Sequence, residues 1–342
     1  MRRLRTLRFL LRSIGVLSAA LVAIVVAWVG ANQVRASVVE VEPEQVAAPP
    51  DGRWVEAGDV LMFVREWGPR DGPVIVLTHG TGAWSGTWFD TPGFLGARGW
   101  RVIAVDLPPF GFTRVRSGAT LLDYRRASQA RRLLLAVQAL TSRPVVMMGH
   151  SFGAGPALEA AMLEPDRVRA LVLVDPALGL GPRGEMGGCH PGPSGWPMDS
   201  RTARTAIVRS TATVPALTGV LLRQFVHRPE AVTPDRLAQY RRPFVRRDFS
   251  ARLGDWAATF AGADCLGARS TDPVALSAWA HGARLALIWG AEDTITPPAQ
   301  GVALGRLTGT TPVFIPGVGH IPHIEDPARF QAALAAAIAV VQ

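Results

Sequence analysis

The sequence predicts an α/β fold: a mostly parallel, doubly wound sheet with a helical cap, preceded by a transmembrane helix. Short apolar runs alternate with helical stretches along most of the 342 residues, which is the pattern of a doubly wound sheet. One of these runs enters a helix through Gly-x-Ser-x-Gly, which is typical of a sharp strand-to-helix turn. A third observation, a charge-free stretch near the N-terminus, predicts the transmembrane helix.

Residues 1–36 predict a basic segment followed by a transmembrane signal anchor. Five arginines precede Ile14–Ala31, eighteen residues without a charge, a length just sufficient to span a bilayer. Only Arg35 follows, so the positive-inside rule places the N-terminus in the cytoplasm and the rest of the chain on the extracytoplasmic side. Val34-Arg35-Ala36 also resembles a cleavage site, so secretion after cleavage near Ala36 is the alternative.

The remainder of the chain divides into a linker and one domain. Residues 37–52 contain Pro43, Pro49 and Pro50 and predict an extended spacer. Residues 53–342 predict the α/β domain, within which residues 178–282 interrupt the alternation of strands and helices. An insertion there would lie over the C-terminal ends of the strands, where ligands of open α/β sheets bind, so we interpret it as a cap.

Local patterns predict the individual elements of the domain. Continuous apolar runs predict buried strands at residues 74–78, 101–105, 144–148, 171–174, 285–290 and 312–316. Helices are expected at residues 121–140, from an amphipathic pattern, and at residues 154–163. Four arginines of the first helix, at positions 125, 126, 131 and 132, lie on its polar face and are expected to be solvated.

The most informative motif is Gly149-His150-Ser151-Phe152-Gly153, between a predicted strand and a predicted helix. A turn this tight places the central residue in a strained backbone conformation, and glycine on both sides leaves room for it. The strain directs the Ser151 hydroxyl out of the top of the sheet, where a substrate carbonyl can reach it. Ser151 is therefore the predicted nucleophile.

A second loop predicts an oxyanion hole. The strand at 74–78 is followed by His-Gly-Thr-Gly at residues 79–82, a position from which an amide can join that of the residue after the nucleophile. The expected donors are the backbone N–H groups of Thr81 and Phe152. Trp84 and Phe152 flank these donors, so we expect them in the wall of the substrate pocket. His79 is a further candidate for substrate binding, although structural hydrogen bonds suit its position better.

In the order of its motifs the chain resembles the α/β-hydrolase superfamily. HGTG, DLPPFGFT, GHSFG, GAED and GVGHIPHIEDP stand where that superfamily has its counterparts, over roughly residues 53–342. The resemblance implies a triad of Ser151, Asp293 and His320, in that chain order. A serine at the elbow disfavours the branches that use an aspartate nucleophile. Pro109 departs from the pattern, which has glycine there, and is expected to stiffen the loop beside the site.

A serine hydroxyl needs a base at neutral pH, and histidine, with an ordinary pKa of roughly 6.5, suits that task. His320 follows Gly-Val-Gly directly after a predicted strand, in a loop that can carry its ring over the sheet. His323 lies one turn further on and is the alternative base. The other histidines are expected in structural or solvated positions.

A carboxylate fixes the tautomer of such a histidine and stabilises the imidazolium that forms. Among the candidates that follow strands, Asp293 lies nearest to His320 in the sequence. Asp175 and Asp106 also follow strands, and the expected role of both is to organise a loop by accepting hydrogen bonds from backbone amides. Asp175 is the alternative acid.

Charge and cysteine content exclude several functions. The net charge is +9 and every basic residue is arginine. Six of these arginines lie in the first 36 residues, so a net charge of about +3 belongs to the rest. Basic and aromatic residues do not interleave as in a nucleic-acid groove, and the cysteines and histidines show no metal-ligand spacing. We therefore expect no nucleic acid, metal or cofactor.

The predicted cap contains three tryptophans and both cysteines. Trp196, Trp256 and Trp279 either line an apolar pocket or pack within the cap. Cys189 and Cys265 can pair in an oxidising compartment, and closing a loop of about 76 residues would stabilise the fold by roughly 4 kcal/mol. The sequence does not decide between a disulfide bond and two free thiols.

Together these features predict an exported, membrane-bound serine hydrolase that cleaves an ester or related acyl compound through an acyl-enzyme intermediate. Peptide, lactone or carbon–carbon bond hydrolysis, or perhydrolysis, on the same scaffold is one alternative, and a catalytically silent binding protein is another. The expected partners are a small acyl substrate and the membrane, while the sequence gives no indication of an oligomeric state. Cap side chains set the substrate, so the fold alone does not name it.

Overall fold

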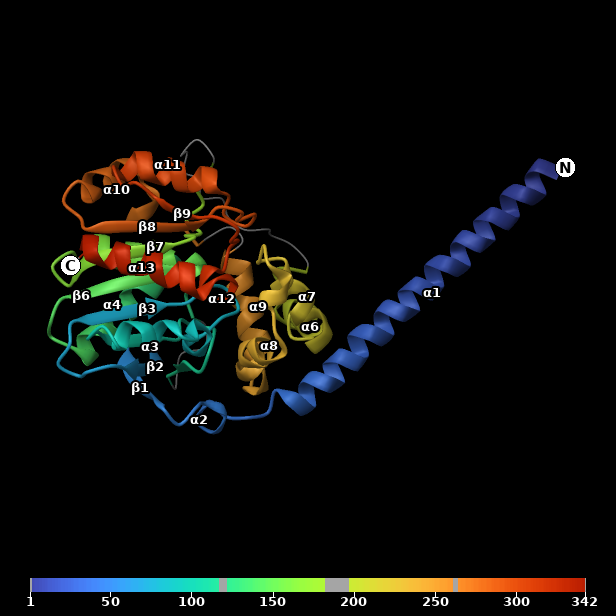
Figure 1. Ribbon diagram of the computed structural model, residues 1–342. Coiled ribbons are helices and arrows are strands. Elements are labelled where there is room, and N and C mark those ends of the chain that lie inside the picture. Colours follow the sequence, from blue (N-terminus) through green and yellow to red (C-terminus); the bar gives the residue numbers. More distant parts are fainter. Residues whose placement is uncertain (1, 117–121, 182–196, 261–263, 342) are drawn as a thin grey trace.

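The strands form a single sheet. The computed structural model describes residues 2–116, 122–181, 197–260 and 264–341. Within these ranges nine strands pair in the order β1-β2-β4-β3-β6-β7-β8-β9, with the short β5 beside β2 (Figure 1). The strands are β1 Gly52–Ala57, β2 Val60–Trp67, β3 Val74–Thr78, β4 Arg101–Val105, β5 Arg114–Val115, β6 Val145–His150, β7 Val168–Val174, β8 Leu285–Gly290 and β9 Val313–Ile315.

The sheet is mostly parallel, as predicted. β2 runs antiparallel to β1, β4 and β5, and the pairs from β4 through β9 are parallel. All six predicted strands are present, with ends shifted by up to three residues. β1 and β2 were not predicted individually, because their side chains include several polar and half-exposed residues that hide the apolar pattern.

Helices cover both faces of the sheet, because successive strand side chains point to opposite faces. In β3, Val74 and Val76 belong to one apolar core, and Ile75 and Leu77 belong to the other. The doubly wound fold is therefore confirmed. The first core is closed by α4 (Arg126–Leu140), α5 (Ala154–Leu163), α10 (Pro273–Ala280) and α11 (Pro298–Thr308), and the second by α3 (Thr91–Gly96) and α13 (Pro327–Val341).

The inserted segment places four helices, among its described residues, beyond the ends of the strands on the side from which α1 emerges (Figure 1). Its last part packs on the sheet domain instead, where Trp279 of α10 donates a hydrogen bond to the Ala161 carbonyl at 3.2 Å. The four cap helices are α6 (Arg201–Ser210), α7 (Pro215–Arg223), α8 (Pro234–Arg241) and α9 (Phe249–Phe260). The remaining short elements are α12 (Pro322–Glu325) and the 3₁₀ turns η1 Ser85–Trp88, η2 Ser151–Gly153, η3 Pro229–Ala231, η4 Arg242–Val245 and η5 Arg269–Thr271.

Two residues singled out in the cap, Cys189 and Trp196, lie outside the described residues. Cys265 is described and is disulfide-bonded. The pairing of Cys265 with Cys189 stays a prediction.

Helix α4 is shorter than predicted, and its arginines are more buried. It begins at Arg126, five residues after the expected start. Arg126 and Arg132 are only 2% and 4% exposed, because Arg126 pairs with Asp264 at 3.1 Å and Arg132 pairs with Asp59 at 2.6 Å. The expectation of solvated arginines is wrong for these two residues. The sequence pattern identifies the polar face of the helix, but it does not reveal distant carboxylates that pack against that face.

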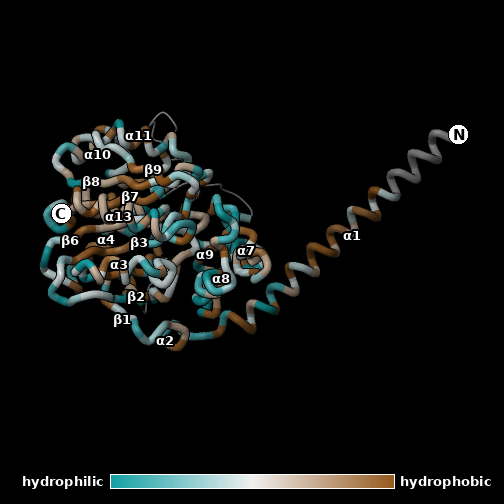
Figure 2. Tube along the Cα trace, in the orientation of Figure 1, coloured by the Kyte–Doolittle hydropathy of each residue, from teal (hydrophilic) through white to brown (hydrophobic). Residues whose placement is uncertain are grey.

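Helix α1 (Arg2–Val39) projects from the rest of the molecule (Figure 1). Its segment Ser13–Val39 is long and apolar enough to be a candidate membrane span. Figure 2 shows that hydrophobic residues follow one another along much of the projecting part, as the charge-free stretch predicts.

The segment predicted to be an extended spacer makes specific contacts with the cap. Helix α1 continues to Val39, and a single turn, α2 (Glu44–Ala47), follows Pro43. Glu40 is 6% exposed, and the backbone at Glu42 pairs with that at Arg246 of the cap. Composition does not reveal these contacts, because the partners Arg246 and Ser250 lie about 200 residues later in the sequence.

Candidate active site

The sharp strand-to-helix turn predicted at Ser151 is present. Ser151 directly follows β6 and opens the turn that leads into α5. Its φ is +50°, a left-handed conformation that a residue other than glycine adopts only under constraint. Both glycines are required, because a Cβ atom on Gly149 would lie 2.6 Å from the Ala154 Cα atom and one on Gly153 would lie 2.5 Å from the His79 carbonyl oxygen.

Ser151, His320 and Asp293 form a continuous chain of hydrogen bonds. The Ser151 hydroxyl lies 2.8 Å from His320 Nε2, and His320 Nδ1 lies 2.7 Å from Asp293 Oδ2. The three residues follow β6, β9 and β8, so the sheet brings them to one edge. With Nδ1 donating to the carboxylate, Nε2 offers a lone pair to the hydroxyl hydrogen. This arrangement can activate a serine hydroxyl.

Asp293 is held in its ionised form. Burial raises its pKa, but hydrogen bonds from His320 and Thr296 outweigh burial and bring the pKa below the ordinary value. Its Oδ1 atom accepts hydrogen bonds from the backbone N–H groups of Ile295 at 2.7 Å and Thr296 at 3.0 Å. The Thr296 hydroxyl also donates to Oδ2 at 2.6 Å. Thr296, which the sequence analysis did not single out, therefore fixes both carboxylate oxygens.

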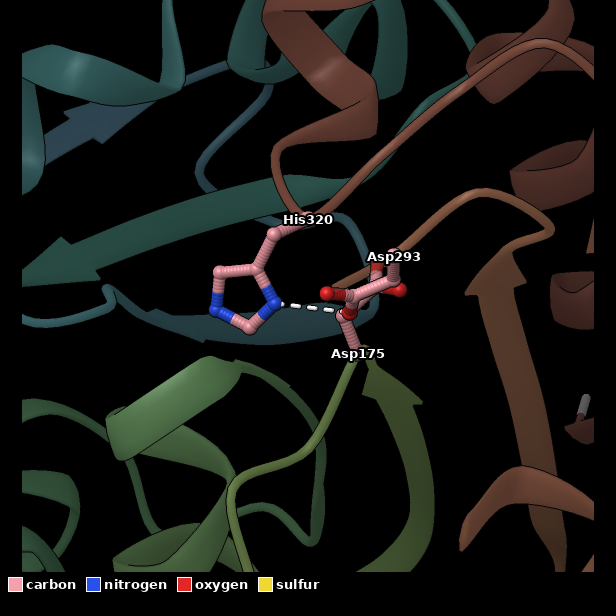
Figure 3. Close-up of side chains that lie close together, drawn as sticks. All are labelled: Asp175, Asp293 and His320. Carbon is pink, nitrogen blue, oxygen red and sulfur yellow. Dashed lines mark hydrogen bonds and ion pairs between the residues drawn. The ribbon is translucent and has the colours of Figure 1, made fainter. Parts of the chain in front are cut away.

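A second carboxyl group, Asp175, lies beside this pair (Figure 3). It follows β7, is fully buried and accepts a hydrogen bond from the Gly290 N–H group at 2.7 Å. Burial, followed by the proximity of Asp293, raises the pKa of Asp175 well above its ordinary value, which favours its protonated form. Of these two acids, Asp293 is the one that shares a hydrogen bond with His320 Nδ1. The geometry therefore favours Asp293 over Asp175 as the acid.

Asp175, Asp293 and His320 also form a cluster that could hold a metal ion, because their ligand atoms lie within 4.8 Å of one another. Metal ligands must be deprotonated at the binding atom. Here His320 Nδ1 carries the hydrogen that it donates to Asp293, and the environment of Asp175 favours its neutral form. The arrangement therefore fits proton transfer better than metal binding.

Asp106, the remaining acid, organises a loop. It accepts hydrogen bonds from the backbone N–H groups of Ser85 at 2.6 Å and Phe112 at 2.7 Å, and burial raises its pKa to about 6. The same loop is held from the cap by Arg246, a fully buried residue that donates to three carbonyl groups of residues 109–113. Sequence reasoning missed Arg246, because these acceptors are far from it along the chain.

The loop that carries His320 is held by Glu325. The Glu325 carboxylate accepts hydrogen bonds from the N–H groups of Gly319 at 3.0 Å and Ile321 at 3.1 Å, on either side of His320. It also accepts one from the backbone of His227 in the inserted segment at 2.8 Å. Glu325 therefore ties the histidine loop to the insertion. The sequence could have pointed to Glu325 only through its position in the GVGHIPHIEDP motif. A glutamate outside a motif would not have suggested this role.

Two other histidines near the site are buried and neutral. His323, the alternative base, packs against Trp88 with ring centroids 4.9 Å apart, and burial lowers its pKa to about 3. His79 accepts a hydrogen bond from the Leu107 N–H group at 3.0 Å, and burial lowers its pKa to about 4. His79 is 1% exposed, so its contacts are those of a structural residue and not of a substrate ligand.

A cavity of about 320 Å³ opens over the triad, at the lower end of the range for small-molecule sites. Its walls come from the loop at residues 80–83, the cap helices and the histidine loop. Among the described residues, the side chains that line it include no Asp, Glu, Lys or Arg. Beside the elbow and His320 they are Thr81, Ala83, Val208, Ala212, Thr218, Leu221, Leu222, Phe225, Tyr240, Phe244, Phe249, Leu253, Trp256, Ala257 and Ile321.

Trp84, which was expected in the pocket wall, does not line this cavity, whereas Trp256, for which the sequence left a pocket or a packing role open, does. Trp84 is fully buried, with its ring 5.2 Å from that of Phe112 and its Nε1 atom donating to the Gln239 carbonyl at 2.8 Å. The expectation for Trp84 is therefore corrected. Proximity to the oxyanion loop in the sequence does not fix the direction of a side chain, and here the ring fills a separate aromatic cluster.

The two loops that carry the predicted oxyanion donors are adjacent. A Cβ atom on Gly80 would lie 3.1 Å from the Ser151 Cβ atom, so the backbone of the first loop touches the elbow. Thr81 lines the cavity. The Phe152 ring turns into the core, with centroids 5.7 Å from Phe110 and 5.3 Å from Trp256. The Phe152 ring therefore does not form a wall of the cavity.

A serine, a histidine and an aspartate that follow three parallel strands of a doubly wound sheet indicate an α/β hydrolase. Comparison with known families agrees: the model of the alpha/beta hydrolase family matches residues 75–333. The chain belongs to this family.

Individual relatives show how far the likeness extends. A non-heme chloroperoxidase of Streptomyces lividans is 35% identical over 114 residues, which are 33% of this chain and 40% of that protein. The chain thus spans less than half the length of this curated relative. A solved membrane phospholipase A, described as a bacterial virulence factor, has a TM-score of 0.61 at 21% identity, with 98% of each chain covered. The 2-hydroxy-6-oxo-6-phenylhexa-2,4-dienoate hydrolase of Rhodococcus sp. strain RHA1 has a TM-score of 0.63 at 18% identity, covering 84% of this chain and 98% of that one. These two likenesses show the fold alone.

Proposed function

We propose that this protein is a membrane-anchored serine hydrolase that cleaves esters of apolar acyl chains through an acyl-enzyme intermediate. The observation that carries the proposal is the hydrogen-bonded chain of Ser151, His320 and Asp293 beneath an apolar cavity. Membership in the alpha/beta hydrolase family supports hydrolysis as the class of reaction. The nucleophile and the acyl-enzyme route rest on the geometry of the three residues.

The first half-reaction transfers the acyl group to the enzyme. The Ser151 oxygen attacks the ester carbonyl while its proton moves to His320 Nε2. Asp293 stabilises the imidazolium through the hydrogen bond at Nδ1. The N–H groups of Thr81 and Phe152 are the proposed donors to the oxyanion. Collapse of the tetrahedral intermediate breaks the ester bond, and His320 gives its proton to the departing alcohol.

The second half-reaction releases the acid. His320 Nε2, now unprotonated, takes a proton from a water molecule that attacks the acyl-enzyme. The proton then returns from His320 to the Ser151 oxygen as the carboxylic acid leaves. Asp293 supplies the negative charge that stabilises the imidazolium in both halves, and the neutral form of Asp175 beside it adds no second charge.

The cavity supports an apolar acyl chain as the group bound. In the part of the chain that the structure describes, its lining contains no acidic or basic side chain other than histidine, and burying a charged group without a partner costs several kcal/mol. Apolar chains, in contrast, gain about 0.8 kcal/mol for each methylene that leaves water. We therefore infer that the substrate places a hydrocarbon chain among the cap side chains and its ester group at Ser151.

We further propose that α1 is retained as a membrane anchor, with the catalytic domain on the extracytoplasmic side. The excess of arginine before the apolar stretch supports this orientation. Retention is supported by the end of the helix, because α1 continues through Ala36 without a break and Ala36 is fully buried. The fold shared with the membrane phospholipase A extends over 98% of this chain, which also supports α1 as part of the architecture.

Esters of graded chain length test the proposal. We expect the full chain in detergent micelles to hydrolyse p-nitrophenyl esters with a preferred acyl length set by the cavity. Ala257→Phe fills part of the cavity and should shift the preference to shorter chains. Ala299→Phe, at an exposed position of α11, is the matched control and should leave the preference unchanged. Absence of turnover with every ester would contradict the function, and an unchanged preference in Ala257→Phe would contradict the assignment of the cavity.

A further inference from the structure

The last turns of α1 are built into the cap. The last carbonyl groups of a helix have no hydrogen-bond donor within that helix. Side chains of α1 donate to two such carbonyl groups at the C-terminal end of α6. Trp28 Nε1 donates to the Ser210 carbonyl at 2.9 Å, and the Arg35 guanidinium donates to the Arg209 carbonyl at 3.0 Å. Helix α1 therefore caps the end of α6.

A buried carboxylate fixes this junction. Glu40, just past the end of α1, is 6% exposed. It accepts a hydrogen bond from the Ser250 hydroxyl of α9 and lies 3.6 Å from the Arg209 guanidinium of α6. A buried carboxylate is stable only with such partners. These contacts fix the direction of α1 relative to α6 and α9. If α1 crosses a bilayer, they also fix how the cap is oriented relative to the bilayer plane.

Trp28 indicates the level of the membrane surface. It lies three residues before the end of the apolar stretch Ile14–Ala31, and tryptophan is enriched at the boundary between lipid and water. Because Trp28 contacts Ser210, the C-terminal end of α6 lies at this level. Figure 1 shows α6 near the end of α1 that joins the cap, and α7 follows α6 in the chain.

The same two helices expose large apolar side chains. Ile207 of α6 is 45% exposed, and Val220 and Leu221 of α7 are 52% and 44% exposed. Single exposed apolar residues are ordinary, but these come from consecutive helices that together are apolar enough for a broken membrane span, bent by 83°. Leu221 also lines the catalytic cavity. Leu221 therefore belongs both to the exposed apolar side chains and to the lining of the cavity.

We propose that Ile207, Val220 and Leu221 insert into the lipid leaflet next to α1, and that the substrate is an ester resident in that leaflet. Its acyl chain passes from the lipid across Leu221 into the cavity without entering water. The inference rests on the proposed function and anchor. The bilayer is the occupant that the observations favour, because α6, which carries Ile207, is in contact with α1, the helix that is apolar enough to cross a bilayer. Contact with a second copy of the chain would be a different outcome of the test.

Entry of the substrate from lipid would explain why an apolar residue, Leu221, connects the exposed patch with the cavity. A hydrocarbon chain is in apolar surroundings both in lipid and in the cavity, so the hydrophobic effect does not favour either place. A continuous apolar path between them lets the chain move without being exposed to water, which would cost free energy. An amphiphile with its ester at the membrane surface would present the reacting carbonyl at the level of the cap, while its chain stays in apolar surroundings throughout.

The test uses the full chain in phosphatidylcholine vesicles and two esters with the same leaving group. p-Nitrophenyl butyrate is supplied from water, and p-nitrophenyl laurate is supplied in the vesicles. Ile207→Asp and Val220→Asp place a charge in the patch at positions outside the cavity lining. Val274→Asp, on α10 at a residue 76% exposed, is the matched control. We expect laurate turnover to fall about fivefold in each patch variant and to stay at the wild-type level in the control. Butyrate turnover should be unchanged in all three variants.

A second measurement reads insertion directly. Val220→Cys and Val274→Cys are labelled with an environment-sensitive fluorophore, and only the label at position 220 should shift to shorter wavelength on vesicles. The inference is overturned if laurate turnover is equal in patch and control variants while the label at position 220 reports water. A change of oligomeric mass in Val220→Asp with unchanged laurate turnover overturns it too, and assigns the patch to a second copy. Loss of turnover with both esters in the wild-type protein would instead refute the proposed function, and the fluorophore would still report on insertion.

Discussion

At the scale of single residues, the site places side by side two aspartates whose surroundings shift their pKa values in opposite directions. Asp293 accepts hydrogen bonds from His320 and Thr296, which offset its burial and keep it ionised. Asp175 has one backbone donor and a charged neighbour, so burial raises its pKa strongly. The two residues are of the same type, so their surroundings account for the difference. The surroundings of Asp293 favour the charged form that can stabilise an imidazolium, and those of Asp175 favour the neutral form.

Replacing each aspartate by asparagine should distinguish the two acids at pH 7.5. Asp293→Asn removes the charge that orients and stabilises His320, so kcat on p-nitrophenyl esters should fall by about 10⁴-fold with the fold retained. Asp175→Asn closely resembles the neutral acid that it replaces and should change kcat by no more than about threefold. Circular dichroism of both variants checks the fold. If Asp175→Asn shows the larger loss, the acid follows β7 and not β8.

At the scale of elements, α12 and the loop before it carry the histidine and fix its position. Glu325 binds the backbone on both sides of His320 and reaches into the insertion. On the same short helix, His323 is buried between Trp88 and His150, with ring centroids at 4.9 and 5.1 Å. One turn of helix therefore combines a carboxylate that orders the loop with a neutral ring that packs it onto the core.

The burial of His323 predicts a pH dependence of stability. Burial lowers its folded-state pKa to about 3, whereas the unfolded chain takes up a proton near the ordinary value of 6.5. The contribution of His323 is therefore complete above pH 6.5 and is lost as the pH falls, by about 2 kcal/mol between pH 7 and pH 5. His323→Phe should reduce the loss of unfolding free energy over this range by that amount, measured by urea denaturation at both pH values. Equal losses in the variant and the wild-type protein would show that His323 is not neutral in the fold.

Local patterns predicted the elements well, and long-range contacts were beyond them. The strands, the elbow at Ser151 and the loop of His320 follow from apolar runs and glycine positions within a few residues of each site. The burial of Arg126 and the role of Arg246 do not, because their partners lie more than a hundred residues away. The direction of the Trp84 ring likewise depends on an aromatic cluster assembled from distant segments.

At the scale of the whole molecule, the N-terminal helix α1, the cap and the sheet domain form one connected system. Composition separated them into an anchor, a spacer and a domain, yet α1 caps α6 and Glu40 packs between cap helices. The cap in turn reaches the site through Arg246 and through the backbone contacts of Glu325. A periodic or compositional pattern cannot reveal such a connection, since it consists of single polar contacts between remote segments.

A disulfide bond between Cys189 and Cys265 would add a covalent link within the inserted segment. Cys265 is disulfide-bonded, and the chain has two cysteines. We expect thiol titration of the denatured, unreduced protein from an oxidising compartment to find no free thiol, and reduction to release two. Reduction should also lower the free energy of unfolding by roughly 4 kcal/mol in the chain-entropy estimate. Two free thiols before reduction would contradict the pairing and weaken the case for export.

The central claim is that Ser151 is the nucleophile of this molecule, and active-site labelling tests it most directly. A fluorophosphonate probe reacts with a serine that a histidine activates, so the full-length protein should take up one label, located by mass spectrometry on the peptide that contains Ser151. Ser151→Ala should abolish labelling and lower ester turnover by several orders of magnitude, because only the oxyanion donors and substrate binding remain. A label on another residue, or turnover undiminished in Ser151→Ala, would contradict the account.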